Sequence, residues 1–102
     1  MKVKKVSAED VITEAKKYLK HKENIELIQK ALDYAAVKHS GQFRKSGEPY
    51  VVHLWNVGYI LASLRVGPKT VAAGILHDVI EDQNVTKEEL AEEFDSEIAE
   101  QF

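Results

Sequence analysis

Signals that start and stop helices recur along the whole chain and divide it into segments with the apolar spacing of helices. The clearest segment is 24–39, where apolar residues fall three or four positions apart, as on one face of a half-buried helix: Ile25, Ile28, Leu32, Ala35 and Ala36. No segment alternates apolar and polar residues for long enough to build a sheet. The sequence therefore predicts an all-α fold.

Local signals also predict where the other helices begin. Ser7 and Asp10 have the spacing of a capping box, which opens a first helix through about Leu19. Segment 41–49 contains two glycines, a serine and a proline, so it is predicted to be a loop after the second helix.

Three more helices are expected, over 49–64, 68–81 and 86–94. Pro49 and Pro68 suit the first turn of a helix, where the missing N–H costs nothing. Thr86 and Glu89 repeat the capping-box spacing, and Ser96 is predicted to cap a last, short helix.

Length and cysteine content limit the class of protein. With 102 residues the chain can form one small domain with a modest core. It has no cysteine, so any metal ion must be held by His, Asp or Glu. The lysines at the N-terminus are not followed by an apolar run, and the longest stretch without charged residues, 49–64, is too short and polar to span a bilayer. We expect a soluble, cytoplasmic protein with no membrane partner.

Charge is distributed unevenly between the two halves of the chain. Residues 1–50 carry a net charge of +4 and residues 51–102 a net charge of −7. A basic half is suited to phosphate and an acidic half to a cation, although solvated helix faces would show the same asymmetry.

Four ionisable residues lie close together in the predicted fourth helix: His77, Asp78, Glu81 and Asp82. At about 100° per residue, all four fall on one face of that helix. Adjacent carboxylates repel one another, and a divalent cation would remove that cost. Imidazole and carboxylate together favour Mn, Fe, Zn or Ni over Mg or Ca.

Further metal ligands have to come from elsewhere in the chain. The strongest candidate is His53, which lies within an otherwise apolar segment; a core histidine with a satisfied ring is the competing interpretation. His39 and His21 are weaker candidates, because His39 ends a helix and His21 lies between two lysines.

The predicted loop at 41–49 contains Arg44, Lys45 and Ser46, followed by Tyr50. The planar guanidinium of arginine fits a phosphate or a purine face, and lysine supplies a point charge. Basic loops are also common on hydrated protein surfaces, so this loop indicates a binding site only in combination with the neighbouring histidine and carboxylate motif.

Taken together, these motifs resemble a known family. His77–Asp78 is the doublet of the HD superfamily of metal-dependent phosphohydrolases. The order and spacing of three motifs resemble the N-terminal hydrolase domain of the RelA/SpoT family: segment 44–50, His53 and segment 74–82. Members of that family include GTP pyrophosphokinases and bifunctional synthetase/hydrolases of the stringent response. The resemblance covers residues 7–102.

The resemblance implies a fold, an activity and a cofactor. The fold would be an all-α HD-domain bundle, and the activity would be hydrolysis of the alarmone (p)ppGpp at its 3′ position to GDP or GTP and pyrophosphate. The cofactor would be Mn²⁺, bound by two histidines and two aspartates. The substrate would thus be a guanosine 3′,5′-bis-phosphate-type nucleotide, with no direct nucleic-acid partner.

Residue roles carry over by position. The metal ligands would be His53, His77 and Asp78. Glu81 and Asp82 would orient and deprotonate the attacking water. The nucleotide would be held by Arg44, Lys45 and Ser46, with Arg44 against the guanine.

Two departures from the family pattern affect these expectations. Leu54 stands where the family usually has proline, and the fourth ligand of the family, an aspartate, corresponds to a position beyond residue 102. We therefore expect residues 1–102 to be the N-terminal part of a truncated hydrolase domain, without the synthetase and regulatory domains. Such a fragment would bind Mn²⁺ weakly or not at all, be inactive by itself, and self-associate through the face that the absent helices would cover.

Two other functions stay open at this point. The parent protein could be an HD phosphohydrolase for another nucleotide, although the loop at Arg44–Ser46 favours the RelA/SpoT assignment. It could also be a (p)ppGpp synthetase in which the HD domain is a degenerate regulatory module. The presence of both Glu81 and Asp82 argues against that module.

Overall fold

The computed structural model describes residues 6–83 and 85–101, with side chains for 6–79 and 85–101. Within these residues it contains six helices: α1 (Ala8–Lys16), α2 (Lys22–Lys38), α3 (Tyr50–Ser63), α4 (Pro68–Gln83), α5 (Lys87–Glu93) and α6 (Ser96–Ala99). The one extended pairing found in this part of the chain is an isolated bridge between Phe43 and Pro49. The all-α prediction is confirmed.

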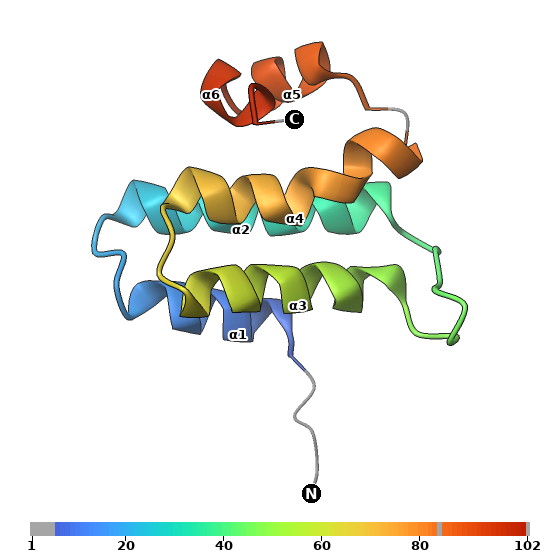
Figure 1. Ribbon diagram of the computed structural model, residues 1–102, viewed down its shortest axis with the longest axis horizontal. Helices are drawn as coiled ribbons and strands as arrows, with labels where there is room; N and C mark the ends of the chain where they lie inside the picture. Colours follow the sequence, from blue (N-terminus) through green and yellow to red (C-terminus); the bar gives the residue numbers. More distant parts are fainter. Residues whose placement is uncertain (1–5, 84, 102) are drawn as a thin grey trace, which may run out of the picture.

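The helices stack in layers around α4 (Figure 1). α1 and α3 lie side by side in one layer, α2 and α4 form the next, and the short helices α5 and α6 lie beyond them. α4 packs against α3 in the first layer, α2 in its own layer and α6 in the outer layer. Its apolar side chains are fully buried as a result: Val71, Ala72, Ile75, Leu76 and Val79.

Capping explains where the helices begin. Ser7 and Asp10 make the reciprocal bonds of the predicted capping box at α1. At α5 only half of the predicted box is present: Thr86 accepts a hydrogen bond from the backbone N–H of Glu89, whereas the carboxylate of Glu89 bonds to Tyr34. The prediction that Ser96 caps the last helix is wrong. Asp95 is the cap, because its carboxylate accepts the Ile98 N–H at 2.8 Å and Ser96 is already helical.

Two glycines allow α3 and α4 to approach closely. A Cβ atom on Gly74 of α4 would lie 2.2 Å from Cδ1 of Leu61 on α3, well inside the contact distance. A Cβ on Gly58 of α3 would lie 3.1 Å from the side chain of Ile75 on α4. The small size of these residues therefore sets the spacing of the two helices that carry the candidate metal ligands.

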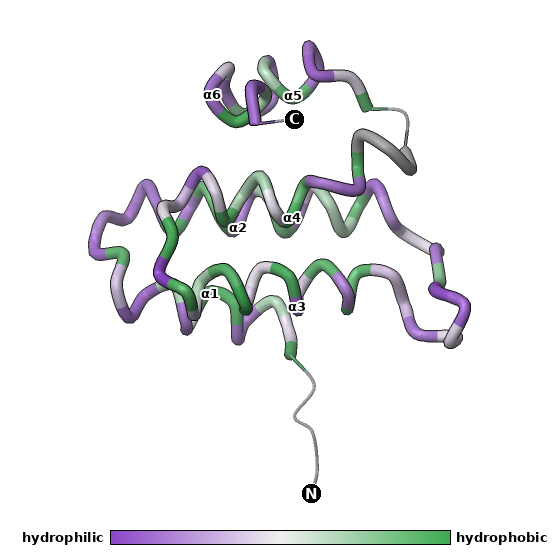
Figure 2. The backbone as a smooth tube through the Cα atoms, viewed as in Figure 1, coloured by the Kyte–Doolittle hydropathy of each residue, from purple (hydrophilic) through white to green (hydrophobic). Residues whose placement is uncertain are grey.

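Polar residues gather where the chain turns (Figure 2). The turn between α1 and α2 and the loop between α2 and α3 are largely hydrophilic, whereas α3 is mostly hydrophobic. Among the described residues, no helix has both the length and the apolar character needed to cross a membrane.

Candidate functional site

The helical hairpin of α3 and α4 brings two of the predicted metal ligands together. His53 lies ten residues before the last residue of α3, and Asp78 lies ten residues after the first residue of α4. At about 1.5 Å per residue, both lie about 15 Å from the turn that joins the helices. The two side chains therefore meet across the close α3–α4 contact.

Asp78 is the centre of the resulting cluster. Its Oδ2 lies 3.7 Å from Nε2 of His53, and its Oδ1 lies 3.1 Å from Nδ1 of His77. The side chain of Asp78 is 17% exposed, that of His53 33% and that of His77 63%. The predicted shared face of His77 and Asp78 is thus present, with Asp78 on the inner side of the face and His77 on the outer side.

Asp78 is held in its charged form by its neighbours. Burial raises the pKa of this carboxyl, but hydrogen bonds from Tyr50 and His77, with the nearby His53, outweigh burial and leave the pKa below its ordinary value. A carboxylate that stays ionised at neutral pH is suited to hold a cation.

Sequence reasoning missed the contact between Tyr50 and Asp78. The Tyr50 hydroxyl donates a hydrogen bond to Oδ2 of Asp78 at 2.7 Å. Its ring also stacks on His39, with centroids 4.7 Å apart, and meets the ring of His53 edge to face. One signal could have pointed to it, because Tyr50 precedes His53 by three residues and so lies on the same face of α3.

His39 is buried against this cluster and is not placed with the metal ligands. It is 2% exposed, and its Nδ1 lies 2.7 Å from the amide oxygen of Gln42. His21 caps the start of α2 from an exposed position, with no side-chain hydrogen bond to the helix.

The donor chemistry of the cluster fits a divalent metal ion. Ligand bonds of about 2.1 Å place two donor atoms on one ion about 3.0–3.4 Å apart. The 3.7 Å between His53 and Asp78 is close to that separation. Among the side chains that the structure describes, however, no group of three His, Cys, Asp or Glu residues is arranged to hold a metal, and His77 meets Asp78 from the exposed side.

The predicted water-activating residues cannot be placed. Glu81 and Asp82 belong to the last turns of α4, but their side chains lie outside the described part of the structure. Their assignment stays a prediction from the sequence.

The loop between α2 and α3 is a short, tightly bonded hairpin. The N–H of Arg44 donates to the carbonyl of Glu48, and the N–H of Gly47 donates to the carbonyl of Arg44, each at 2.8 Å. Gly47 has φ +87°, which a residue with a side chain rarely adopts. These bonds expose Lys45 and Ser46 at the tip.

A hollow of about 570 Å³ opens beside this hairpin. It is lined by Phe43, Arg44, Lys45, Ser46 and Tyr50. Tyr50 therefore belongs to both parts of the site, because its ring lines the hollow and its hydroxyl contacts Asp78. The three predicted nucleotide-binding residues lie together, on the side of the bundle where α3 begins.

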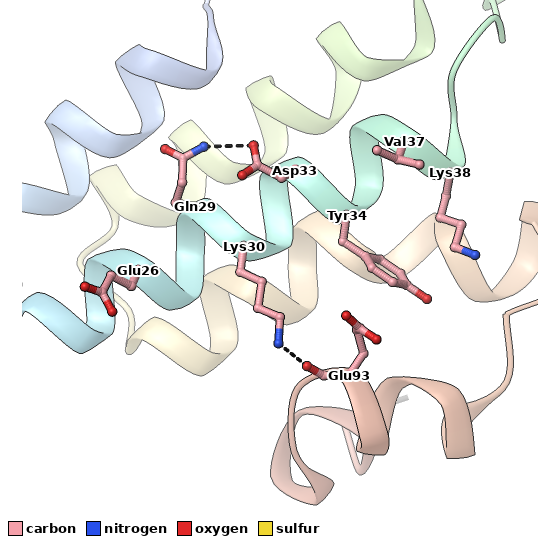
Figure 3. Close-up of a pocket in the computed structure, with 8 residues that line it drawn as sticks. All are labelled: Glu26, Gln29, Lys30, Asp33, Tyr34, Val37, Lys38 and Glu93. Atoms are coloured by element: carbon pink, nitrogen blue, oxygen red, sulfur yellow. Dashed lines mark hydrogen bonds between the residues drawn. The ribbon is translucent and has the colours of Figure 1, made fainter.

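A second hollow, of about 510 Å³, lies between α2 and α5 and contains none of the predicted site residues (Figure 3). Its cations are engaged with neighbouring groups. Lys30 donates to the backbone carbonyl of Glu93, and Nζ of Lys38 lies 3.5 Å from the carboxylate of Glu89. These contacts hold α5 against α2.

Comparison with known proteins identifies the family. The HD domain family model matches residues 31–100, a range that includes every predicted site residue. The chain is 48% identical over 95 residues to a guanosine-3′,5′-bis(diphosphate) 3′-pyrophosphohydrolase from Spiroplasma citri. The alignment covers 92% of this chain and 13% of that protein.

Two further relatives show the same relationship. The chain is 52% identical over 71 residues to the protein of the same name from Borreliella burgdorferi, covering 70% of this chain and 11% of the relative. It is 49% identical over 76 residues to a GTP pyrophosphokinase from Myxococcus xanthus, covering 74% of this chain and 10% of the relative. The chain thus spans 10–13% of the length of these relatives. It belongs to the HD-domain family and, over most of its length, is homologous to the RelA/SpoT proteins.

Proposed function

We propose that residues 1–102 are the nucleotide- and metal-binding part of a Mn²⁺-dependent hydrolase that converts (p)ppGpp to GDP or GTP and pyrophosphate. The observation that carries this proposal is the meeting of His53 and Asp78, 3.7 Å apart, beside a hollow lined by Arg44, Lys45 and Ser46. The proposed metal ligands and the basic loop lie next to each other. A nucleotide could therefore bind the loop while its 3′ diphosphate lies beside the metal ion.

The metal site is assigned to the histidines and the aspartate of the α3–α4 hairpin. HD-domain hydrolases typically bind divalent metals, and the proposed ligands here are His53, His77 and Asp78. When bound, Mn²⁺ would supply Lewis-acid chemistry, polarising a phosphoryl oxygen and lowering the pKa of water. The low pKa of Asp78 keeps this ligand deprotonated at neutral pH.

The nucleotide is assigned to the hairpin loop. The guanidinium of Arg44 would lie against the guanine ring, and Lys45 and Ser46 would hold phosphate oxygens with a charge and a hydroxyl. The backbone bonds of the loop fix its shape before the substrate arrives, so less conformational entropy is lost on binding.

The hydrolytic step is assigned to the end of α4. Glu81 and Asp82 follow Asp78 by three and four residues, so they begin one helical turn further along. There they would orient a water molecule and accept its proton as it attacks the phosphorus bound to O3′. The O3′–P bond breaks, the attacked diphosphate leaves as pyrophosphate with the water oxygen, and the ribose 3′ oxygen takes up a proton to give GDP or GTP.

The test uses the natural protein that carries this sequence. It is incubated with ppGpp and Mn²⁺, and pyrophosphate release is measured alongside a panel of other nucleotides. We expect release from ppGpp that depends on Mn²⁺ and is lost in His77→Ala. No release, release unaffected by His77→Ala, or faster hydrolysis of a different nucleotide would contradict the proposal.

A further inference from the structure

Tyr50 contacts the oxygen of Asp78 that faces the other proposed ligand. Its hydroxyl donates to Oδ2 at 2.7 Å, and the same Oδ2 lies 3.7 Å from Nε2 of His53. The hydrogen bond therefore helps to fix the orientation of the Asp78 carboxylate, because it is made to the same oxygen that faces His53. A carboxylate oxygen has two lone pairs, so a bond from Tyr50 leaves a second position on Oδ2 for a cation.

The ring of Tyr50 is held in place on several sides. It stacks on His39 with an interplanar angle of 15°, and it meets His53 edge to face at 5.6 Å. The backbone N–H of Tyr50 donates to the carbonyl of Gln42 at 2.9 Å, and the ring of His39 is in turn fixed by the side chain of Gln42. Because both the ring and its backbone are anchored, the hydroxyl is presented to Asp78 from a fixed direction.

We propose that Tyr50 is a positioning residue, whose hydroxyl holds the carboxylate of Asp78 in the orientation that binds the divalent metal ion. This inference rests on the proposed function, because it takes Asp78 as a metal ligand. Groups that hydrogen-bond to metal ligands typically change metal affinity by about 10- to 100-fold when they are removed.

The ring of Tyr50 has a separate role that the test has to keep intact. It lines the hollow beside Arg44 and stacks on His39, so its removal would disturb both the loop and the packing. Tyr50→Phe removes the hydroxyl and retains the ring. Tyr34→Phe is the matched control, because the Tyr34 hydroxyl also donates to a carboxylate, that of Glu89, between α2 and α5.

The experiment measures Mn²⁺ binding to the natural protein by electron paramagnetic resonance of the free ion. The site is defined as the Mn²⁺ binding that Asp78→Asn abolishes. We expect Tyr50→Phe to weaken binding at this site about tenfold, with an unchanged circular dichroism spectrum. Tyr34→Phe is expected to bind Mn²⁺ as the wild type does.

A second measurement requires no metal. In a crystal structure of metal-free Tyr50→Phe, the carboxylate of Asp78 is expected to turn away from His53. Equal Mn²⁺ affinity in Tyr50→Phe and the wild type would overturn this inference alone. If the wild type showed no Mn²⁺ binding that depends on Asp78, the metal site of the proposed function would fail, and the inference with it.

Discussion

His53 on α3 and Asp78 on α4 face each other across the helical hairpin, with Nε2 of His53 3.7 Å from Oδ2 of Asp78. Neither residue is fully buried, and their helices pack closely where Gly58 and Gly74 face the larger side chains of Ile75 and Leu61. Two of the candidate metal ligands are therefore carried by two helices packed together, and the hollow lined by Arg44, Lys45 and Ser46 lies on the side where α3 begins. The first prediction concerns this pair.

His53→Ala is expected to reduce Mn²⁺-dependent hydrolysis of ppGpp at least about 100-fold, because loss of a direct ligand costs more than the 10- to 100-fold loss typical of groups around the ligands. Pyrophosphate release at fixed Mn²⁺ is the measurement. His21→Ala is the control, since His21 is exposed and its side chain does not bond to the helix that it precedes. An unchanged rate in His53→Ala would remove His53 from the site.

The second prediction concerns the spacing of α3 and α4. Gly74→Ala places a methyl group 2.2 Å from Cδ1 of Leu61, so the leucine or the helix has to move. Overpacking costs about 1–3 kcal/mol, and the better helix propensity of alanine offsets about 1 kcal/mol of that. We expect a net loss of up to about 2 kcal/mol in the free energy of unfolding, measured by urea denaturation, together with weaker Mn²⁺ binding.

Leu61→Ala provides the matched test of this explanation. Combined with Gly74→Ala it removes the clash, so the double variant is expected to lose less stability than the two single variants added together. If the losses of the two single variants simply add, the clash with Leu61 is not the reason that Gly74→Ala destabilises the protein.

Most of the fold could be predicted from the sequence because its signals are local. A capping residue such as Ser7 or Thr86 acts on amides only two or three positions away, so its pattern is visible in the sequence. The same local rule failed at the last helix, where Asp95 and Ser96 are adjacent and both are good capping residues. Only the backbone conformation shows that the helix starts one residue earlier.

The candidate site was predictable in part. The helical period placed His77 and Asp78 on one face, but it could not show which of them points into the domain and which into solvent. The bond from Tyr50 to Asp78 joins residues 28 positions apart and depends on how α3 packs against α4. The sequence spacing indicates only that Tyr50 and His53 share a face of α3, and the partner of the Tyr50 hydroxyl is visible only in the structure.

The third prediction tests the shape of the basic loop. Gly47 has φ +87° and no atom within 4 Å of a built Cβ, so Gly47→Ala would add backbone strain without a clash. Strain of this kind costs about 1–2 kcal/mol, and we expect a loss of that size in urea denaturation together with a raised KM for ppGpp.

Gly67→Ala is the control for the loop. A Cβ at Gly67 also meets nothing within 4 Å, but the backbone there does not have the left-handed φ of Gly47. Gly67 directly precedes α4, and alanine caps a helix less well than glycine, so we expect a smaller loss of stability than in Gly47→Ala, with an unchanged KM. Equal effects of the two substitutions would argue against strain as the cause.

The fourth prediction concerns acid stability at α6. The backbone N–H of Ile98 and the nearby ammonium of Lys69 lower the pKa of Asp95 in the folded protein. A lowered folded pKa stabilises the protein above the unfolded value of about 3.9, and this stabilisation is lost as the pH falls through the folded pKa. The wild type is therefore expected to be more stable than Asp95→Asn at pH 6, with the difference vanishing toward pH 2.

Thermal unfolding at a series of pH values measures this difference. Asparagine is also a good capping residue, so Asp95→Asn isolates the charge, whereas Asp95→Ala removes the cap as well and should cost about 1 kcal/mol more at every pH. A wild-type advantage that grows toward low pH would contradict the stated direction of the pKa shift.

The last prediction separates the charge of Arg44 from its planar shape. Arg44 lines the hollow beside Tyr50 and is exposed there, so a base could lie against its guanidinium. Loss of a stacked, charged contact of about 1.4 kcal/mol would raise the KM for ppGpp about tenfold in Arg44→Ala. Arg44→Lys retains the charge but not the planar group, so it should recover only part of the lost affinity, and less of it at high salt.

Lys87→Ala is the control: Lys87 lies on the exposed start of α5, and this substitution is expected to leave KM unchanged. Full recovery in Arg44→Lys would reduce the role of Arg44 to its charge, and an unchanged KM in Arg44→Ala would remove this residue from the nucleotide site.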